Sequence, residues 1–562
     1  MAVTRFWVGG TGTWDATTTH WSASSGGAGG ASVPNTSADT AVFDAASGGG
    51  TVTRTATGAL GNLDFRGQGI TGDFSGTFAG SGQFGGLNGN LTWSPTMTAS
   101  YTGTIFHNAS GTITSNGLVV NAQHTVNGAG ITVQQADDYH TNKGLSLTFT
   151  GSWKTNGHQL RCDNGFNFSS ASARTFDFTG SLVIAGGNTG GGIFASATNL
   201  TLTYNASSKV QFLMTGNAAS FQSVGLVWPD IDVAGSGGGT LTFGTAGVGN
   251  PSYGNITLNN TGGATLTWNV TQSAKSIVAS AGCTMTLAGN QNATLTAGDY
   301  KLVNTMPAPT YSGSMTFNAA ATQNVTTGGL TLAHNITING AGTTVKFLDS
   351  FTSTNTISLT VGGLKTNGQA MNTKDLIMAN GTTLDTTGGT TWTLASTVHI
   401  TWQVPASGSC TFTTDANFVV QCNMGAQNIG FHGGSGNTYA TINVSRVSGA
   451  GIIAFSDNFT MTNLNLQTAP VSLEWTPGFV FTIGTLTGSG TPANHNNFHS
   501  NAPTNQYTLS KAQNFVSTVD YLDVTDAKMT GGGFWDVGAH GIDGGNNNGV
   551  RFLPGVIGRA AA

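Results

Sequence analysis

Short stretches in which apolar residues stand two apart, mostly with Thr or Ser between them, recur between residues 328 and 402 and constrain the fold most. Such alternation is typical of half-buried β-strands. Turn-forming pairs such as Asn339-Gly340 and Gly388-Gly389 separate the stretches, and nothing between them has helical periodicity. The stretches are Leu330-Thr331-Leu332, Ile336-Thr337-Ile338, Ile357-Ser358-Leu359-Thr360-Val361, Leu376-Ile377-Met378 and Trp392-Thr393-Leu394.

Strands this short fit either the hairpins of a sandwich or the successive sides of a coil whose turns stack on one another. We favour the coil, and we predict an all-β fold, an elongated right-handed parallel β-helix (β-solenoid) with N-terminal and C-terminal caps. The same pattern continues through residues 51–500, for example in Leu200-Thr201-Leu202 and Ile256-Thr257-Leu258. Its spacing is irregular, which indicates loops of variable length on turns that average about 20–25 residues.

The composition excludes several classes of protein. Charged residues make up 7% of the chain, whereas about 25% is usual, so Ser, Thr and Asn must supply solubility. The 84 glycines follow no Gly-X-Y period and there are only 12 prolines, which excludes collagen. With a net charge of −5 and scattered Lys and Arg, no nucleic-acid-binding surface is indicated. We expect no cofactor.

The chain carries no visible export signal. Its start lacks a basic segment followed by an apolar one, and no apolar run approaches the roughly 20 residues that span a bilayer. We therefore expect assembly in a host cytoplasm and no membrane insertion. Cys162, Cys283, Cys410 and Cys422 show no metal-binding spacing and are expected to be buried thiols, with Cys410 and Cys422 possible neighbours on adjacent strands.

Residues 1–50 differ from the rest of the chain. Trp7, Trp14 and Trp21 fall seven apart, but the Gly and Thr between them exclude a heptad helix. One interpretation is a cap that covers the open end of the solenoid. The alternative is an attachment segment that holds the protein on a larger assembly. We accordingly divide the chain into a Trp-rich segment (1–50), a solenoid body (51–500) and closing turns with a cap (501–562).

The two ends resemble a known class of proteins. The N-terminal series is Trp7-Val8-Gly9-Gly10-Thr11-Gly12-Thr13-Trp14, His20-Trp21-Ser22, Val33-Pro34 and Ala38-Asp39-Thr40-Ala41-Val42-Phe43-Asp44, and the C-terminal one includes Val519-Asp520-Tyr521-Leu522-Asp523-Val524 and Gly533-Phe534-Trp535. These series resemble bacteriophage tail-fibre-like and tailspike-like β-helix proteins with autotransporter-associated-type repeats. The resemblance covers roughly the first 50 and last 60 residues. It implies a virion structural protein, commonly a homotrimer.

Candidate catalytic and metal-binding groups are sparse. The chain has one glutamate, Glu474, whereas glycosidases use paired carboxylates. Asp137-Asp138-Tyr139-His140 is the best local acid/base cluster, although adjacent strand residues point to opposite faces. His495 and His499 stand four apart in a loop-like stretch. The C-terminal acids fit no Ca²⁺-binding loop and are expected to form a polar cap: Asp520, Asp523, Asp526, Asp536 and Asp543. We predict no catalytic residue and no metal.

The aromatic residues separate into two predicted groups. Trp268, Trp392 and Trp402 share parity with neighbouring apolar residues and are expected to fill the core. A glycan-binding surface needs exposed aromatic rings near amides. Four residues beside turns are our candidates for such a platform: Trp153, Trp228, Trp475 and Tyr139.

The sequence therefore favours a non-enzymatic virion structural protein, a tail fibre or tailspike-like protein that recognises host surface glycans. Its expected partners are copies of itself in a homotrimer, other virion proteins and host polysaccharide, and its expected location is the surface of the particle. Three alternatives stay open. They are a capsid decoration or head-fibre protein, a polysaccharide depolymerase tailspike, which facing Asp residues on neighbouring turns would support, and a secreted adhesin, which would need an export signal.

Overall fold

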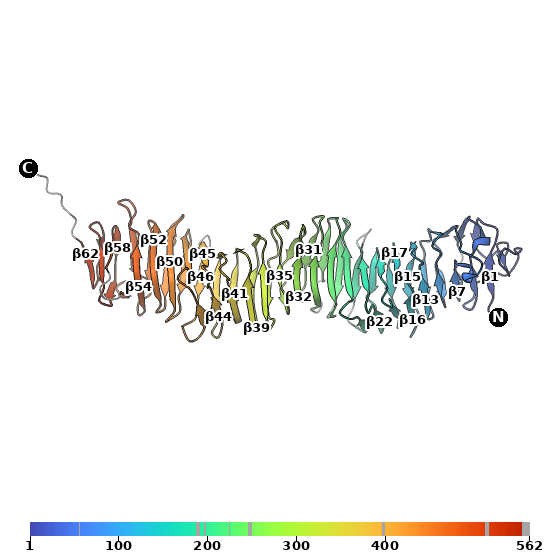
Figure 1. Ribbon diagram of the computed structural model, residues 1–562, viewed down its shortest axis with the longest axis horizontal. Helices are drawn as coiled ribbons and strands as arrows, with labels where there is room; N and C mark the ends of the chain where they lie inside the picture. Colours follow the sequence, from blue (N-terminus) through green and yellow to red (C-terminus); the bar gives the residue numbers. More distant parts are fainter. Residues whose placement is uncertain are drawn as a thin grey trace, which may run out of the picture. The chain divides into compact units, whose positions relative to one another are not determined.

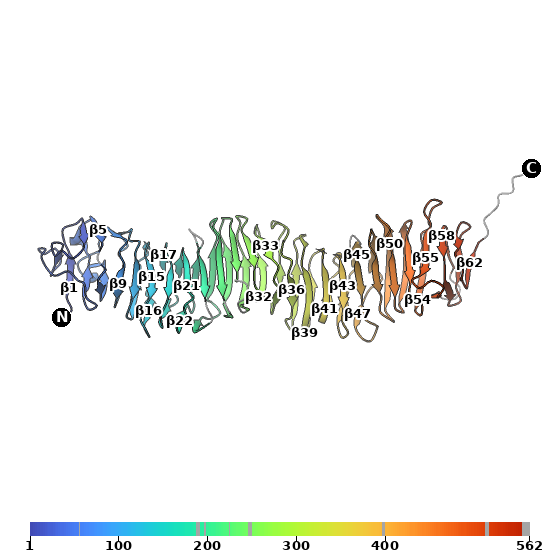
Figure 2. The same cartoon turned by 180° about the vertical axis from the view of Figure 1, so that it is seen from behind.

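The computed structural model describes residues 1–55, 57–186, 191–195, 198–223, 225–244, 250–395, 399–511 and 516–553. Within these ranges the regular structure is β, apart from two short 3-10 turns, η1 (Ala45–Ser47) and η2 (Gly67–Gly69). The chain forms two compact units, residues 1–291 and residues 292–562. In each unit, strands of successive turns lie side by side (Figures 1 and 2).

In the first unit, most turns place strands on three sides, which we call faces. Face A holds β1 (Thr4–Trp7), β3 (Trp21–Ser22), β4 (Thr40–Val42), β7 (Asn62–Asp64), β10 (Leu91–Thr92), β13 (Gly111–Thr114), β16 (Thr132–Gln135), β19 (Ser152–Lys154), β22 (Arg174–Asp177) and β25 (Leu200–Thr203). Face B holds β2 (Gly12–Trp14), β5 (Thr51–Arg54), β8 (Thr77–Gly80) and β11 (Thr98–Ala99).

Two further faces complete this unit, and face D occurs in the later turns, where face B has ended. Face C holds β6 (Ala59–Leu60), β9 (Phe84–Leu87), β12 (Thr104–His107), β15 (Gln123–Val126), β18 (Leu145–Leu147), β21 (Gly165–Phe168), β24 (Gly192–Ala195), β27 (Ala219–Ser223), β29 (Thr240–Phe243), β31 (Thr265–Trp268) and β33 (Thr286–Gly289). Face D holds β14 (Val119–Val120), β17 (Tyr139–Thr141), β20 (Leu160–Cys162), β23 (Leu182–Ala185), β26 (Lys209–Leu213), β28 (Asp230–Ala234), β30 (Ser252–Leu258) and β32 (Gln272–Ala279).

The second unit is also a stack of turns. Face E holds β38 (Thr331–Leu332), β40 (Phe351–Ser353), β42 (Met371–Thr373), β45 (Thr391–Ala395), β48 (Val419–Met424), β50 (Thr438–Arg446), β52 (Thr460–Thr468), β54 (Val480–Thr487), β56 (Tyr507–Ser510) and β59 (Ala527–Thr530). Face F holds β34 (Ala293–Leu295), β36 (Ser314–Phe317), β43 (Asp375–Met378), β46 (Ile400–Gln403), β49 (Ile429–His432), β51 (Ile453–Ser456), β53 (Ser472–Trp475), β55 (Asn496–Ser500), β58 (Leu522–Val524) and β61 (Ile542–Asp543).

Two shorter faces form the remaining side of this unit. Face G holds β35 (Tyr300–Lys301), β37 (Thr322–Thr326), β44 (Thr383–Asp385) and β47 (Thr411–Thr413). The long strands β39 (Asn335–Phe347) and β41 (Thr356–Lys365) run through both face F and face G, with a register shift between their two halves. Face H holds β57 (Val516–Val519), β60 (Phe534–Val537) and β62 (Val550–Phe552).

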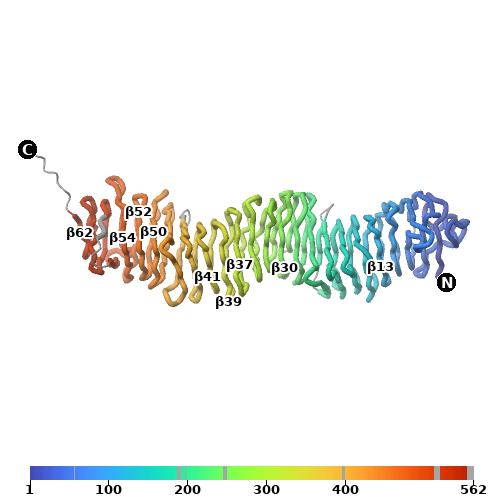
Figure 3. Tube along the Cα trace, viewed as in Figure 1, coloured from blue at the N-terminus to red at the C-terminus, as the bar shows by residue number. Residues whose placement is uncertain are grey.

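The strand pairs that the structure describes are parallel, apart from β1 with β3. This confirms the predicted parallel β-solenoid and rejects the sandwich of hairpins. Hydrogen-bonded partners on adjacent turns are 19 residues apart at Thr356 and Asp375, and 27 apart at Thr386 and Thr413. These spacings agree with the predicted average turn, and Figure 3 shows the turns following one another within each unit. The right hand of the coil stays a prediction.

Like residues stack on like residues along the core. Leu266 pairs with Leu241 on one side and Leu287 on the other, and all three side chains are fully buried. Alternation thus turns one side of most strands inward, and stacking makes the buried layer continuous from turn to turn. Trp268, Trp392 and Trp402 are fully buried, as predicted.

The corners between strands are tied from one turn to the next by polar side chains. Asp137 accepts hydrogen bonds from the backbone N–H and the hydroxyl of Ser115, 22 residues earlier, at 2.8 and 3.1 Å, and from the backbone N–H of Asn116. Asn116 has a left-handed backbone with a φ of 50°, which Asn tolerates. Asp349 accepts from the backbone of Thr327 and Gly328 in the same way. Backbone donors that the sharp corner leaves unpaired are satisfied in this manner.

The three N-terminal tryptophans are buried and pack around one ring. Trp7, Trp14 and Trp21 lie with ring centroids 5.9, 5.6 and 5.8 Å from that of Phe43. Trp21 also contacts the other two edge-on, at 5.3 and 5.0 Å. Strands β1, β2 and β3 bring the rings together because each carries one tryptophan inward. The role of this cluster as a cap or an attachment segment, and the boundaries near residues 50 and 500, stay predictions.

Candidate functional site

Two surface grooves occur where a face of the solenoid comes to an end. Face A has no strand after β25 in the described part of the first unit, and the groove beside it begins at Tyr204, directly after that strand. Face G ends at β47 in the second unit, and the other groove includes the turn after β49. Each groove thus lies close to the end of a face in the order of the strands.

The groove after β25, which we call the Tyr204 groove, has a volume of about 530 Å³. Its lining comes from four consecutive turns through the loop before β26 and the starts of β28, β30 and β32. The lining includes Tyr204, Asn205, Val227, Asp230, Asn255 and Lys275.

Tyr204 supplies an aromatic wall that is held in place. Its ring is half-buried and lies with its centroid 5.6 Å from that of Phe178. Its hydroxyl donates a hydrogen bond of 3.2 Å to the carbonyl oxygen of Val227. The residue Val227 is itself 60% exposed. Burial raises the pKa of the Tyr204 phenol, so the group stays protonated and keeps donating at neutral pH. The fixed ring and Val227 together give the groove its apolar rim.

The polar floor of the groove is built by two adjacent turns. Oδ1 of Asp230 accepts hydrogen bonds from the backbone N–H of Asn255 at 2.8 Å and from its side-chain amide at 3.1 Å. Gly254 makes this close approach possible, because a Cβ there would lie 2.3 Å from the same carboxylate oxygen. The Asp230 carboxylate is thereby held by one neighbour in a fixed orientation.

The opposite end of the groove carries a cation. Lys275 is exposed and stands on the next turn, one residue beyond Ala274, which pairs with Tyr253. Lys275 takes part in none of the ion pairs among the described residues. Its ammonium group is therefore available to an anionic group of a ligand in the groove.

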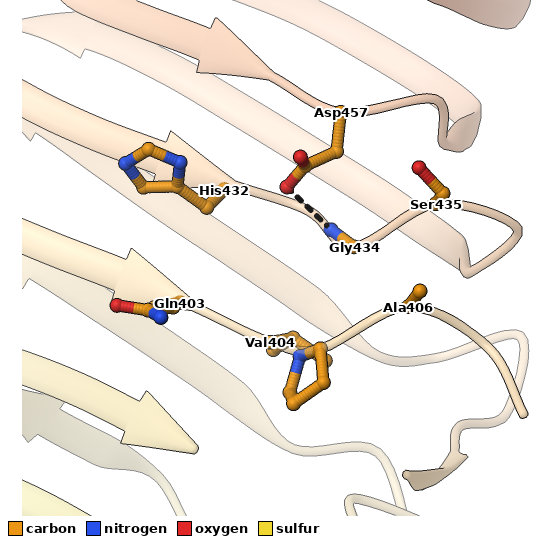
Figure 4. A pocket seen from close by; sticks show the side chains of 8 residues that line it. Gln403, Val404, Ala406, His432, Gly434, Ser435 and Asp457 are labelled. Atoms are coloured by element: carbon orange, nitrogen blue, oxygen red, sulfur yellow. Dashed lines mark hydrogen bonds between the residues drawn. The ribbon is translucent and has the colours of Figure 1, made fainter. Parts of the chain in front are cut away.

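The second groove, which we call the His432 groove, has a volume of about 300 Å³ (Figure 4). Oδ2 of Asp457 accepts a hydrogen bond of 3.1 Å from the backbone N–H of Gly434. Asp457 has a φ of 79°, a left-handed conformation that its bond across the turns supports. Gln403 and His432 pair in register and are both exposed, so they form one polar ridge of this groove.

Neither groove brings two carboxylates together. Asp230 is the single carboxylate among the described residues that line the Tyr204 groove, and Asp457 is the single one in the His432 groove. Hydrolysis of a glycosidic bond by the common mechanism needs an acid and a second carboxylate facing each other across the substrate. What both grooves do offer is hydrogen-bonding groups beside a fixed surface, which suits the binding of a polar ligand.

The four aromatic residues predicted to form an exposed platform are buried, and that prediction is wrong. Trp153 and Trp228 are 1% exposed, Trp475 is fully buried and Tyr139 is 1% exposed. Each ring turns inward because it stands at an inward position of its strand or turn, and its polar atom finds a partner inside where one is available. Nε1 of Trp153 donates to Oε1 of Gln135 at 3.1 Å, for example.

Sequence reasoning missed Tyr204. The alternation of Leu200, Leu202 and Tyr204 predicts that all three side chains point into the core. Leu200 is buried, but Tyr204 lies half-exposed at the place where face A ends. The polar run Asn205 to Ser208 directly after Tyr204 marks the end of the strand and is the only signal in the sequence that bears on it.

The local acid/base cluster does not converge on one point. Asp137 is engaged with the turn before it, and Oδ1 of Asp138 accepts from the backbone N–H of Gln159 at 2.8 Å. His140 lies 3.2 Å from Asp163. Each of these polar side chains thus contacts a different neighbour.

The remaining acidic and histidine candidates pair with one another between turns. Nε2 of His499 lies 3.3 Å from Glu474, and Nδ1 of His495 lies 2.8 Å from Asp523, so the two histidines do not share a ligand. Other C-terminal acids have partners too: Asp520 with His540, Asp526 with Asn546, Asp536 with Arg551 and Asp543 with Asn547. In the described part of the chain, no three His, Cys, Asp or Glu side chains gather as metal ligands would.

The four cysteines are free thiols. Cys162, Cys283 and Cys422 are buried and Cys410 is half-buried. The suggestion that Cys410 and Cys422 stand on adjacent strands is wrong, because Cys410 precedes β47 on face G, whereas Cys422 lies in β48 on face E.

Comparison with known proteins adds no relative. No family model, no curated protein and no solved structure matches this chain. Among the described residues, no helix is long and apolar enough to cross a membrane. A parallel β-solenoid hosts enzymes as well as binding and structural proteins, so the fold alone does not specify the function.

Proposed function

We propose that this protein is a non-enzymatic structural protein of a bacteriophage particle, of the tail-fibre or tailspike type, that binds glycans on the host surface. The observation that carries the glycan part is the Tyr204 groove, where a fixed aromatic ring stands beside amide and charged groups. Sugars present apolar C–H faces and hydroxyl groups together, and such a groove matches both. The resemblance of the two chain ends supports the virion part.

The fold supports a mechanical role as well. A continuous buried layer and hydrogen bonds between turns suit a protein that must keep its shape outside a cell. We propose a homotrimer on the particle surface, with other virion proteins as its attachment partners. The absence of a facing carboxylate pair in both grooves is the reason to prefer binding over cleavage of the polysaccharide.

Binding of the purified, fluorescently labelled protein to candidate host cells tests the proposal. We expect saturable binding and reduced infection when the protein competes with intact phage. Incubation with purified host polysaccharide, followed by measurement of its chain length, tests for cleavage, and we expect no shortening. Well-folded protein that does not bind susceptible cells would overturn the adhesive role and favour a scaffold or capsid decoration protein.

A further inference from the structure

We propose that the Tyr204 groove binds an acidic saccharide, through a sugar residue that carries a carboxylate group. This inference rests on the proposed glycan-binding function and specifies its ligand. The groups that the groove leaves available to a ligand are mainly hydrogen-bond donors and a cation. A matching ligand therefore brings acceptors and a negative charge.

Asn205 shows this bias toward donors most clearly. Its Oδ1 already accepts hydrogen bonds from the backbone N–H of Gly180 at 3.2 Å and from the backbone N–H and hydroxyl of Ser207 at 3.1 and 2.8 Å. Because these bonds fix the carbonyl side toward the protein, the exposed Nδ2 amide group turns its N–H donors to solvent at the rim of the groove.

The acceptors of the groove are occupied in the same way. Both carboxylate oxygens of Asp230 accept from the Asn255 amide, at 3.1 and 3.2 Å, and Oδ1 of Asn255 accepts from the Ser276 hydroxyl at 2.8 Å. Protein donors thus partly satisfy the negative charge of Asp230. On the turn before, Lys209 in β26 is the strand partner of Asp230 in β28, and the lysine is exposed.

Lys275 supplies the attraction for an anion. Lys275 lines the groove, and its ammonium group belongs to none of the ion pairs among the described residues. It stands one turn beyond Asn255, whereas Tyr204 stands two turns before Asn255. A sugar ring stacked on Tyr204 with its carboxylate toward Lys275 would satisfy both groups. A charge-assisted hydrogen bond of this kind is stronger than a neutral one.

The rigidity of the wall lowers the cost of binding. The Tyr204 ring is held between its contact with Phe178 and its hydrogen bond to the Val227 carbonyl, so little side-chain freedom is lost when a sugar stacks on it. Val227 extends the apolar rim beside the ring. The groove therefore offers one preformed stacking surface and one cation, and this combination is complementary to an acidic sugar.

Matched polysaccharides test the inference. The probes are surface polysaccharides from cells that the full-length protein binds, each compared with a carboxyl-reduced sample in which the uronic acids have become neutral sugars. We expect the Kd to be at least tenfold higher after carboxyl reduction. The affinity for the native polysaccharide should fall as the salt concentration is raised. Equal affinity for native and carboxyl-reduced polysaccharide would overturn the acidic-saccharide inference.

Three variants and one control variant locate the site. Lys275→Gln should weaken binding about tenfold and remove most of the salt dependence, whereas Lys301→Gln, an exposed lysine in the second unit, should change neither. Asn205→Asp keeps the Oδ1 bonds that hold the corner but removes the Nδ2 donors, so it should weaken binding while the melting temperature stays the same. Tyr204→Ala should weaken binding of native and carboxyl-reduced polysaccharides alike.

The outcomes separate the two proposals. Unchanged polysaccharide binding by folded Lys275→Gln and Asn205→Asp proteins would overturn this site and leave the adhesive function standing. Binding to cells but to none of their polysaccharides would overturn this inference together with the glycan part of the proposed function, and would leave an adhesive role. Failure of the folded protein to bind any candidate host cell would instead overturn the proposed function.

Discussion

The hydroxyl of Tyr139 lies 2.6 Å from Nε2 of His124 inside the core of the first unit. Nδ1 of the same histidine lies 3.0 Å from Nε2 of His107, so one chain of hydrogen bonds joins three buried side chains. If the phenol donates, His124 must carry its proton on Nδ1 and His107 must accept on Nε2. In this arrangement both imidazoles are neutral, and a protonated His107 would turn a donor toward the Nδ1–H donor of His124.

Acid should therefore destabilise the first unit. Burial lowers the pKa of His107 to about 3, and burial also lowers the pKa of His124 well below its usual value. Below about pH 6.5 the unfolded chain binds protons that the folded chain does not, so the free energy of unfolding falls as the pH falls. Together the two histidines should lower the free energy of unfolding by on the order of a few kcal/mol at pH 5.

Denaturant unfolding at pH 7 and pH 5 measures this effect. His107→Gln should be less stable than the wild type at pH 7 but should lose less stability on going to pH 5. His399→Asn, which changes an exposed histidine, should follow the wild type at both pH values. An equal loss of stability in the wild type and His107→Gln would contradict the prediction.

The corner bond of Asp137 should contribute measurably to stability. Asp137→Ala removes the acceptor for the backbone N–H groups of Ser115 and Asn116 and should cost about 1–3 kcal/mol, because these donors lose their partner. Asp138→Ala is the matched control, since that side chain is 73% exposed and water can replace it. Thermal unfolding of both variants provides the comparison, and equal destabilisation would argue against the role of the corner.

The buried tryptophans should behave as folding residues. Trp153→Ala removes a fully packed ring and should cost about 3–5 kcal/mol, whereas Phe149→Ala, which changes a ring that is 50% exposed, should stay within about 0.5 kcal/mol of the wild type. Any loss of glycan binding by Trp153→Ala should then track its loss of folded protein. Wild-type stability combined with lost binding would restore Trp153 as a contact residue.

Thiol labelling should distinguish one cysteine from the other three. Burial raises the pKa of Cys422 to about 12, and burial also raises the pKa of Cys410, but only Cys410 is partly accessible. Native protein should react slowly at one site, and unfolded protein should react at four. Cys410→Ser should abolish the native reaction, while mass spectrometric detection of label on Cys162, Cys283 or Cys422 in native protein would contradict the structure.

The alternation of apolar and polar residues was sufficient to predict the solenoid and much of its core. Leu266 and Trp268 point inward because period two is a local property of a strand, and it does not depend on what lies on the next turn. The absence of a helical period in the sequence likewise indicated a chain without long helices. The length of a turn was also predictable, since each turn needs enough residues for its strands and corners.

The tertiary structure alone decided which aromatic rings reach the surface. Trp228 and Tyr204 both stand beside turns, yet the first is buried and the second is half-exposed. Exposure depends on the turns before and after, about 20 residues away in sequence, and on whether each of them continues a face. Face A ends at β25, so Tyr204 loses the strand that would have covered it. The sequence thus determined the coil, and the stacking of its turns determined the groove.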